Sequence, residues 1–347
     1  MVTGVARYLG ARVAARLADD PRIERVIGID ALEPAPDAAG LLGDKIEFVR
    51  ADVRTAEPAK IMIRAGVEAV VHMAIASAPH AHAGGRQGMK EQNVIGTMQL
   101  LAACQQAPDL HQLVVRSSTA AYGASFRDPA VFTESTEPRE TPRGGFARDV
   151  LDIEGYVRGF RRRRPDAIST VLRFAPFIGE HANTTLTHYF SQPIVPTVLG
   201  RDPRLQFVHV DDALEILHRS VTEQHPGTFN VAGAGTITLS QAVRRAGRIA
   251  MPVAEQGMSA LAGFARGIAP RGFSLDQLDL FVHGRVVDTA HLVEEFGFEP
   301  RTTAVAFADF LRGQASGALL PRESIQAAEQ AILEQIRQVR AGVRASR

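Results

Sequence analysis

Short apolar runs alternate with longer amphipathic segments through the N-terminal half of the chain. The apolar runs contain many β-branched residues and have the length of buried strands: residues 25–30, 46–52, 69–74 and 112–118. Segments with the length of helices separate them, such as residues 10–19 and 93–106. Because strands that alternate with helices are typical of a parallel sheet covered on both faces, we predict an α/β fold.

Small or polar residues stand where these predicted strands end. They are Asp30, Asp52, Ala74 and Ser118. In an open parallel sheet, ligands bind beyond the carboxyl ends of the strands. We therefore expect these four residues to lie around a ligand site.

Residues 3–10 resemble an incomplete glycine-rich loop, in which Gly4 and Gly10 are present and the middle position holds Arg7. Such a loop alone is equally compatible with a simple turn before a helix. Asp30, however, follows Gly10 by the spacing at which an acid accepts hydrogen bonds from the ribose of NAD and disfavours NADP. We predict an NAD site, in which Arg7 either offers a positive charge to the pyrophosphate or narrows the pocket.

Only Met1 and Val2 precede this loop, whereas a central strand normally has about five residues. We expect either a shortened central strand or a start of the natural chain further upstream.

The composition excludes several classes of protein. The 39 basic and 38 acidic residues nearly balance, so charge gives no reason to expect binding to nucleic acid or an anionic membrane. The single cysteine, Cys104, excludes an intramolecular disulfide and a cysteine-based zinc site. No apolar run has the roughly 18 residues of a membrane span, and no secretory signal is visible. We expect a cytoplasmic protein without a metal site, and we interpret His80 and His82 as part of an exposed loop.

A series of short motifs follows the glycine loop in a fixed order: Asp30, residues 52–53, 72–74, 93–97, 117–123, 172–173, 207–212, 230–231 and Asp288. In this order they resemble the extended short-chain dehydrogenase/reductase family, in its NAD-dependent epimerase/dehydratase branch, over about residues 1–310. In more detail the chain resembles UDP-glucose 4-epimerase-like proteins of actinobacteria.

The resemblance implies a Rossmann-type doubly wound parallel sheet and a smaller C-terminal domain that binds a nucleotide-sugar. We predict that residues 1–175 form the NAD-binding domain, to which residues 205–220 return, and that residues 176–310 form the smaller, interleaved domain. Residues 318–347 have the spacing of an amphipathic helix beyond the usual length of the family. In the family, segments equivalent to about 88–107 and 145–163 pair two subunits, so we expect a homodimer.

The resemblance also implies roles for single residues. Asp30 would hold the adenosine ribose, Asp52 and Val53 would contact adenine, and Ala74 and Asn93 would line the cofactor channel. The complete predicted cofactor set is Gly4, Arg7, Leu9, Gly10, Asp30, Asp52, Val53, Ala74 and Asn93. Ser118 would provide the hydroxyl that hydrogen-bonds the reacting carbonyl or alcohol.

The catalytic pair that the resemblance implies is absent. The family uses a tyrosine and a lysine four residues apart on one helix, where the lysine lowers the tyrosine pKa so that tyrosinate can accept a proton. With Glu154 fixing the register, the two positions hold Phe146 and Val150. The sequence has three lysines, and none follows a tyrosine by four residues. The standard proton transfer of the family is therefore impossible in this chain.

Neighbouring residues are poor substitutes. Arg148 and Tyr156 point away from the cofactor face of the predicted helix, and Asp149 has the wrong charge to stabilise a tyrosinate. Tyr122 is the best surrogate acid or base, although it is also typical of a tyrosine that packs beneath the site. Pro176 replaces an asparagine that binds substrate in many relatives.

Two hypotheses of function remain open. The first is a nucleotide-sugar epimerase or dehydratase that retains Ser118 and uses an atypical proton route, with Tyr122 as a candidate. The second is a catalytically silent NAD-binding sensor or regulatory protein that acts through a partner.

Overall fold

The structure is a computed structural model that describes residues 1–79, 84–139, 142, 145–254 and 275–314, with the backbone alone for 275–278. The predicted loop histidines, His80 and His82, and the predicted helix at 318–347 lie outside the described residues.

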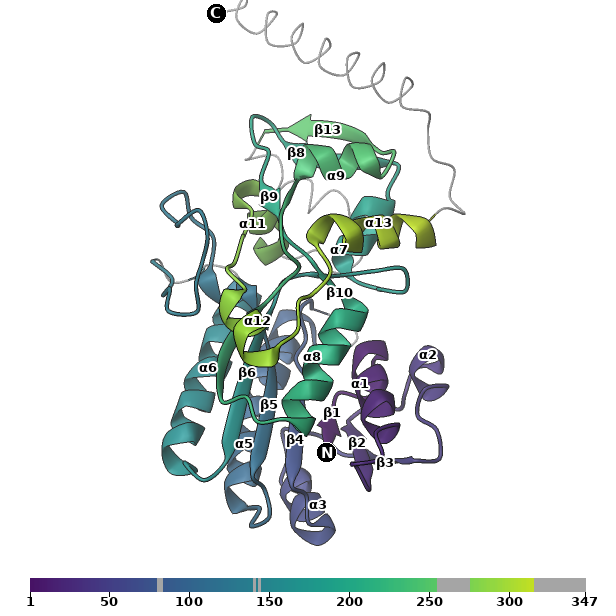
Figure 1. Cartoon of the computed structure of the whole chain (residues 1–347), viewed down its shortest axis with the longest axis vertical. Coiled ribbons are helices and arrows are strands. Elements are labelled where there is room, and N and C mark those ends of the chain that lie inside the picture. Colours follow the sequence, from purple (N-terminus) through teal and green to yellow (C-terminus); the bar gives the residue numbers. More distant parts are fainter. Residues whose placement is uncertain (80–83, 140–141, 143–144, 255–274, 315–347) are drawn as a thin grey trace, which may run out of the picture.

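A seven-stranded sheet forms the centre of the larger part of the molecule, in the order β11-β6-β5-β4-β1-β2-β3 (Figure 1). Every neighbouring pair in this sheet is parallel. Its strands are β1 (Val2–Thr3), β2 (Val26–Asp30), β3 (Ile46–Arg50), β4 (Ala69–His72), β5 (Gln112–Ser118), β6 (Ile168–Phe174) and β11 (Gly227–Val231). The prediction of a doubly wound, Rossmann-type α/β fold is confirmed.

Two of the predicted strands are shorter than expected. β3 ends at Arg50 and β4 ends at His72, each two residues before the predicted end. The chain turns at once after both, because Thr55 donates a hydrogen bond to Asp52 and Ile75 donates one to Met73. The central strand β1 has only two residues.

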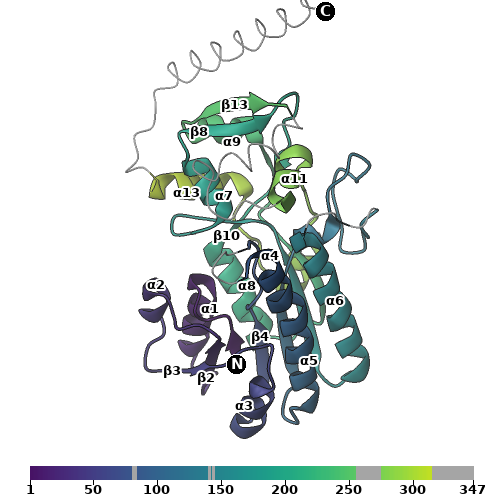
Figure 2. The same cartoon turned by 180° about the vertical axis from the view of Figure 1, so that it is seen from behind.

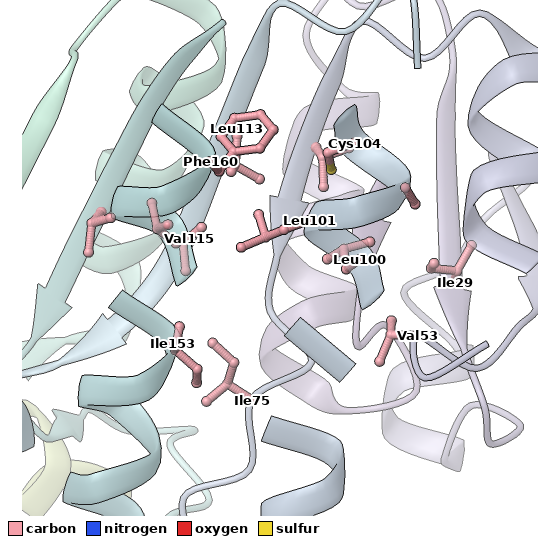
Figure 3. Close-up of a cluster of buried hydrophobic side chains, with 14 of the residues drawn as sticks. Ile29, Val53, Ile75, Leu100, Leu101, Cys104, Leu113, Val115, Ile153 and Phe160 are labelled. Atoms are coloured by element: carbon pink, nitrogen blue, oxygen red, sulfur yellow. The ribbon is translucent and has the colours of Figure 1, made fainter. Parts of the chain in front are cut away.

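Helices cover both faces of the sheet. On one face lie α1 (Tyr8–Ala18) and α8 (Val210–Thr222), which share an apolar cluster with the sheet. On the other lie α3 (Glu57–Ala65), α5 (Gly96–Gln106) and α6 (Gly145–Arg163) (Figure 2). Figure 3 shows how α5 fills the second face, with Leu100, Leu101 and Cys104 packed among side chains of β2, β5 and α6.

Shorter segments complete this part of the chain. They are α2 (Pro36–Ala39), α4 (Gly85–Lys90), a π-helical segment (Glu91–Ile95), a 3-10 segment (Thr119–Tyr122) and α12 (Ala290–Phe296).

A smaller group of elements lies beyond the carboxyl edge of the sheet and has an apolar core of its own, rich in phenylalanine (Figure 1). Its helices are α7 (Thr185–Ser191), α9 (Leu239–Arg245), α11 (Leu275–His283) and α13 (Thr303–Gly313). Its strands are β8 (Ile194–Val198), β9 (Arg204–Leu205), β12 (Ile237–Thr238) and β13 (Ile249–Val253). The pair β7 (Phe177–Ile178) and β10 (Val208–His209) lies where the chain passes between the two groups. The domain limits given above remain predictions.

Within the described ranges, the chain has no helix that combines the length and the apolar character needed to cross a membrane.

Candidate functional site

A cavity of about 570 Å³ lies at the carboxyl edge of the sheet, between the sheet and the smaller group of elements. Its wall is formed by several segments: the glycine loop, the end of β5, the start of α6, the segment after β6, and helices α7 and α11. Its lining includes Gly4, Arg7, Leu9, Gly10, Arg116, Ser118, Phe146, Pro176, Thr184, His188, Phe281 and Arg285. A cavity at this edge is the expected location of a ligand in an open α/β sheet.

The glycine loop is held so tightly that two of its positions accept only glycine. Gly4 has a φ of +81°, and a Cβ there would lie 2.8 Å from the backbone nitrogen of Ala74. A Cβ on Gly10 would lie 2.1 Å from the carbonyl oxygen of Gly4. Arg7 is the N-cap of α1 in extended backbone and makes no capping hydrogen bond with its side chain. The loop thus keeps the tight turn and the close packing of helix on strand that a dinucleotide site requires, with Arg7 added at its middle.

A buried chain of hydrogen bonds fixes the loop to the neighbouring strand. The Thr3 hydroxyl oxygen accepts hydrogen bonds from the backbone N–H groups of Met73 and Ala74, so its proton is donated to Nδ1 of His72, 2.9 Å away. The Thr97 hydroxyl donates to the carbonyl oxygen of Asn93, so Nε2 of His72 donates to Thr97 at 2.9 Å. His72 is therefore a neutral connector, and its burial lowers its pKa to about 3.

The acidic residues of the predicted cofactor set are not among the residues that line the cavity, and Asp30 contacts the glycine loop. The Asp30 carboxylate accepts hydrogen bonds from the backbone N–H groups of Ala6 and Leu32, both at 3.1 Å, which uses part of its acceptor capacity. The Asp52 carboxylate is bound by the guanidinium of Arg54, which is the main cause of a lowered pKa of Asp52.

Two further members of the predicted set are buried and do not line the cavity. Val53 packs in the apolar cluster of α3 and α5. Asn93 is fully buried; its amide bonds both backbone groups of Ala76, and its Nδ2 donates to Asp149 at 3.0 Å. Asp149 is also fully buried, and its carboxylate accepts two hydrogen bonds from Arg86, at 2.7 and 2.6 Å. Asn93 therefore ties α6 to the segment after β4, whose residues Ile75 and Ser77 line the cavity.

Helix α6 presents an apolar surface at the two positions predicted to correspond to the catalytic pair. Phe146 is the α6 residue that lines the cavity, and it is largely buried. Val150 lies one turn further along, in the apolar core with 1% of its surface exposed. Neither side chain can donate or accept a proton, so α6 contributes no acid or base to the cavity wall.

The two predicted catalytic residues have different positions. Ser118 lines the cavity, and its oxygen accepts a hydrogen bond from the backbone N–H of Ala120 at 3.2 Å. Tyr122 is buried outside the cavity lining; its hydroxyl donates to Asn230 at 2.7 Å and accepts from Arg173 at 2.9 Å. Burial raises the pKa of Tyr122. This placement matches the packing role considered for Tyr122, and its role as an acid or base stays a prediction.

Two arginines of the cavity wall were missed by the sequence reasoning. Arg116 lies in β5, two residues before Ser118, and Arg285 reaches the wall from the segment after α11. A charged residue inside the apolar run at 112–118 was the available signal for Arg116, because an unpaired charge is costly in a buried strand. No local pattern distinguishes Arg285.

The chain matches known proteins along most of its length. Residues 1–232 match the family model described as NAD dependent epimerase/dehydratase family. An uncharacterised protein of Mycobacterium tuberculosis is 46% identical over 316 residues, which cover 90% of this chain and 83% of that protein. The matched family is described as NAD dependent, in agreement with the prediction of NAD as the cofactor.

Solved structures of low sequence identity share the fold. The UDP-glucose 4-epimerase of Thermotoga maritima, solved with UDP-glucose, has a TM-score of 0.69 at 17% identity, covering 91% of this chain and 98% of its own. The dTDP-glucose 4,6-dehydratase of Bacillus anthracis, solved with NAD, also has a TM-score of 0.69, at 16% identity with coverages of 91% and 96%. Together with the matched model, the ordered motifs and the seven-stranded parallel sheet, these findings show that the chain belongs to the NAD-dependent epimerase/dehydratase family.

Proposed function

We propose that the protein binds NAD and a nucleotide-sugar in this cavity and does not perform the proton transfer that is standard in its family. The single observation that carries the proposal is the apolar surface of α6, where Phe146 faces the cavity and Val150 lies in the core. Binding and catalysis separate in this protein because the parts that shape the site are present and the parts that move a proton are not.

The support for NAD comes from the glycine loop. Gly4 and Gly10 allow the backbone to turn closely beneath the start of α1, and Tyr8, Leu9 and Gly10 of its first turn line the cavity. The N-terminus of a helix favours an anion, because its first N–H groups have no partner within the helix. Asp30 retains acceptor positions for ribose hydroxyls beside the loop. When bound, NAD supplies a nicotinamide ring that can exchange hydride.

The support for a nucleotide-sugar comes from the opposite wall and from the structural relatives. The smaller group of elements contributes hydroxyl and imidazole groups to the cavity, from Thr184, Thr185 and His188. Such groups can hydrogen-bond the hydroxyls of a sugar. The Thermotoga maritima epimerase, which shares this arrangement of the chain, was solved with UDP-glucose.

A second candidate function is an active epimerase or dehydratase with an atypical proton route. The observation that favours it is the position of Ser118, whose hydroxyl lines the cavity and keeps a proton to donate. For this candidate another residue must accept the substrate proton, and Tyr122 can do so only if its hydroxyl leaves Asn230 and Arg173.

One experiment separates the two candidates. The purified protein is titrated with NAD⁺, UDP-glucose and UDP-galactose by calorimetry, and the same mixtures are assayed for sugar interconversion and for NADH absorbance. We expect binding without turnover. Turnover that is abolished by Ser118→Ala would overturn the silent function and establish the second candidate, and Tyr122→Phe would then test the proton route.

We also propose that the protein is a cytoplasmic homodimer that uses α5 and α6. Ile95 ends the π-helical segment and Met98 lies in the first turn of α5; they are three residues apart, so they share one face, and both are exposed apolar side chains. Light scattering coupled to size exclusion should give twice the mass of the chain, and Met98→Glu should shift the protein toward the monomer. A monomeric wild-type protein contradicts this proposal.

A further inference from the structure

Arg116 is a cation without an anion. Residues alternate between the two faces of a strand, so Arg116 shares the face of Val114, which is the face covered by α1 and α8. One guanidinium nitrogen donates to the carbonyl oxygen of Ile75, whereas the buried Nε has no hydrogen-bond partner. No acidic group among the described residues raises its pKa.

Two other arginines with little exposed surface each have an acidic partner. Arg173 is 12% exposed and forms an ion pair with Glu154 at 2.7 Å. Arg164 pairs with Asp166 at 2.8 Å and also donates to backbone carbonyls. An unpaired buried cation costs free energy that an anion on the open side would recover. The open side of Arg116 is the cavity, whose wall it forms.

The charges around the cavity favour an anion of more than one negative charge. Among the described residues, the charged groups of the wall are the guanidinium groups of Arg7, Arg116 and Arg285 and the carboxylate of Asp37. Arg285 is engaged with the carbonyl oxygen of Gly123. Arg7 is exposed at the glycine loop, and its charge is close enough to Arg116 to act on it: burial and, next, Arg7 lower the pKa of Arg116 to about 10. Arg116 therefore stays protonated at neutral pH while it is repelled by Arg7, and an anion between them would relieve both costs.

We propose that Arg116, together with Arg7, binds a diphosphate group in the cavity. A diphosphate diester carries two negative charges and several acceptor oxygens, which match the free donors of two guanidinium groups. The inference rests on the proposed function, because both proposed ligands contain this group: the dinucleotide joins its two nucleosides by a diphosphate, and the nucleotide-sugar joins sugar and nucleoside by one. Arg116 is thereby a binding residue of this chain's own, added to the glycine loop.

The experiment compares the wild-type protein with Arg116→Met, which keeps an unbranched apolar stem and removes the charge, and with Arg116→Lys, which keeps the charge. Arg64→Met is the matched control, since Arg64 is an exposed residue of α3 away from the cavity. Dissociation constants are measured for NAD⁺, ADP-ribose, UDP-glucose and inorganic pyrophosphate, and for adenosine and uridine, which lack phosphate.

We expect Arg116→Met to raise the dissociation constants of the diphosphate ligands roughly 10- to 100-fold, the range for the loss of hydrogen bonds to a charged group. Arg116→Lys should retain part of the affinity, and the control should retain all of it. Loss confined to NAD⁺ and ADP-ribose assigns the group to the dinucleotide, and loss confined to UDP-glucose assigns it to the nucleotide-sugar. The thermal midpoint of the ligand-free Arg116→Met protein should be unchanged or higher, whereas a purely structural arginine would lower it.

The outcomes separate this inference from the proposed function. If the diphosphate ligands bind wild type and Arg116→Met with equal affinity, the inference is wrong and the proposed function stands. If pyrophosphate binds in an Arg116-dependent way but neither NAD⁺ nor UDP-glucose binds, the anion site stands and the proposed function is wrong. If no diphosphate compound binds the wild type, both are wrong.

Discussion

The glycine loop and the first turn of α6 face the same cavity, but they retain different parts of the family pattern. In the loop, Gly4 and Gly10 are kept where a Cβ would overlap with backbone atoms, and only the middle position departs, to Arg7. In α6, the two positions where the family resemblance would place the proton-transferring pair hold apolar residues, Phe146 and Val150, which pack in the apolar core.

The difference shows which constraints the fold enforces. A glycine that contacts backbone cannot change without displacing a strand or a helix, so the loop depends on folding as well as on ligand binding. A catalytic side chain can change to an apolar group of similar shape and leave the core intact. The same helix also has a buried polar contact, because its Asp149 pairs with Arg86 and Asn93.

The largest effect is expected from Gly10→Ala. Its methyl group would lie 2.1 Å from the Gly4 carbonyl oxygen, so α1 or the loop must move. We expect a loss of about 3 kcal/mol in the free energy of unfolding, at the upper end for overpacking because the obstacle is backbone. Chemical denaturation measures it. Gly43→Ala is the control, since its Cβ would meet nothing within 4 Å. Equal stability of the two variants would refute the steric argument.

Introducing a tyrosine–lysine pair tests the wall of the cavity that α6 forms. The double substitution Phe146→Tyr and Val150→Lys should raise turnover of NAD⁺ with UDP-glucose about 10² to 10⁴ above the background of the wild type, the range for a positioned acid or base. Phe146→Tyr alone should give little, because an unassisted tyrosine has a pKa near 10. NADH absorbance and sugar analysis provide the readout. If the double variant binds both ligands and remains inactive, the cavity has lost more than the pair.

Removing Arg86 tests the buried ion pair that Asp149 of α6 forms with it. Arg86→Met leaves the fully buried carboxylate of Asp149 without its ion-pair partner, and we expect a loss of about 3 kcal/mol in stability. The matched control is Arg148→Met on α6, the helix that carries Asp149; it breaks an exposed pair with Asp152 at 3.7 Å and should cost less than about 0.5 kcal/mol. Denaturant titration of both variants checks the difference. Similar losses would mean that the buried pair contributes little.

Acid should lower the free energy of unfolding of the protein through His72. Its pKa is about 3 in the folded protein and about 6.5 when unfolded, so below pH 6.5 the unfolded chain binds the proton that the folded chain excludes. The contribution of His72 is complete above about pH 6.5 and falls by about 2 kcal/mol on going to about pH 5. Denaturant titrations over this range, compared with His72→Gln, measure it. An unchanged slope in the variant would show that other groups cause the acid sensitivity.

The smallest effect concerns Cys104. Its thiol is fully buried in the cluster of Figure 3, and burial raises its pKa to about 12. We expect no alkylation of the native protein by iodoacetamide at about pH 8, because the thiolate is the reacting species. Mass spectrometry before and after unfolding in urea gives the answer. Rapid modification without denaturant would contradict the packing of α5.

Much of the fold was readable from local pattern. The run at 112–118 became β5 with the same limits, and Ser118 at its end lines the cavity. The predicted limits of β3 and β4 were less accurate, because the chain turns within or just after the last residues predicted to be strand. The sequence pattern alone does not show these turns. Strand formation depends on near neighbours, which is why a single sequence reveals it.

The sequence by itself determined the alternation of strands and helices, the two required glycines and the absence of the tyrosine–lysine pair, because each is a matter of residue type and spacing. The tertiary structure alone decided which distant side chains meet. It placed the Tyr122 hydroxyl against Asn230, 108 residues away, joined Asp149 to Arg86, and left Arg116 with no acid among the described residues. Those pairings follow from how the layers pack, and a charge inside an apolar strand becomes a binding group only when packing gives it an open side and no partner.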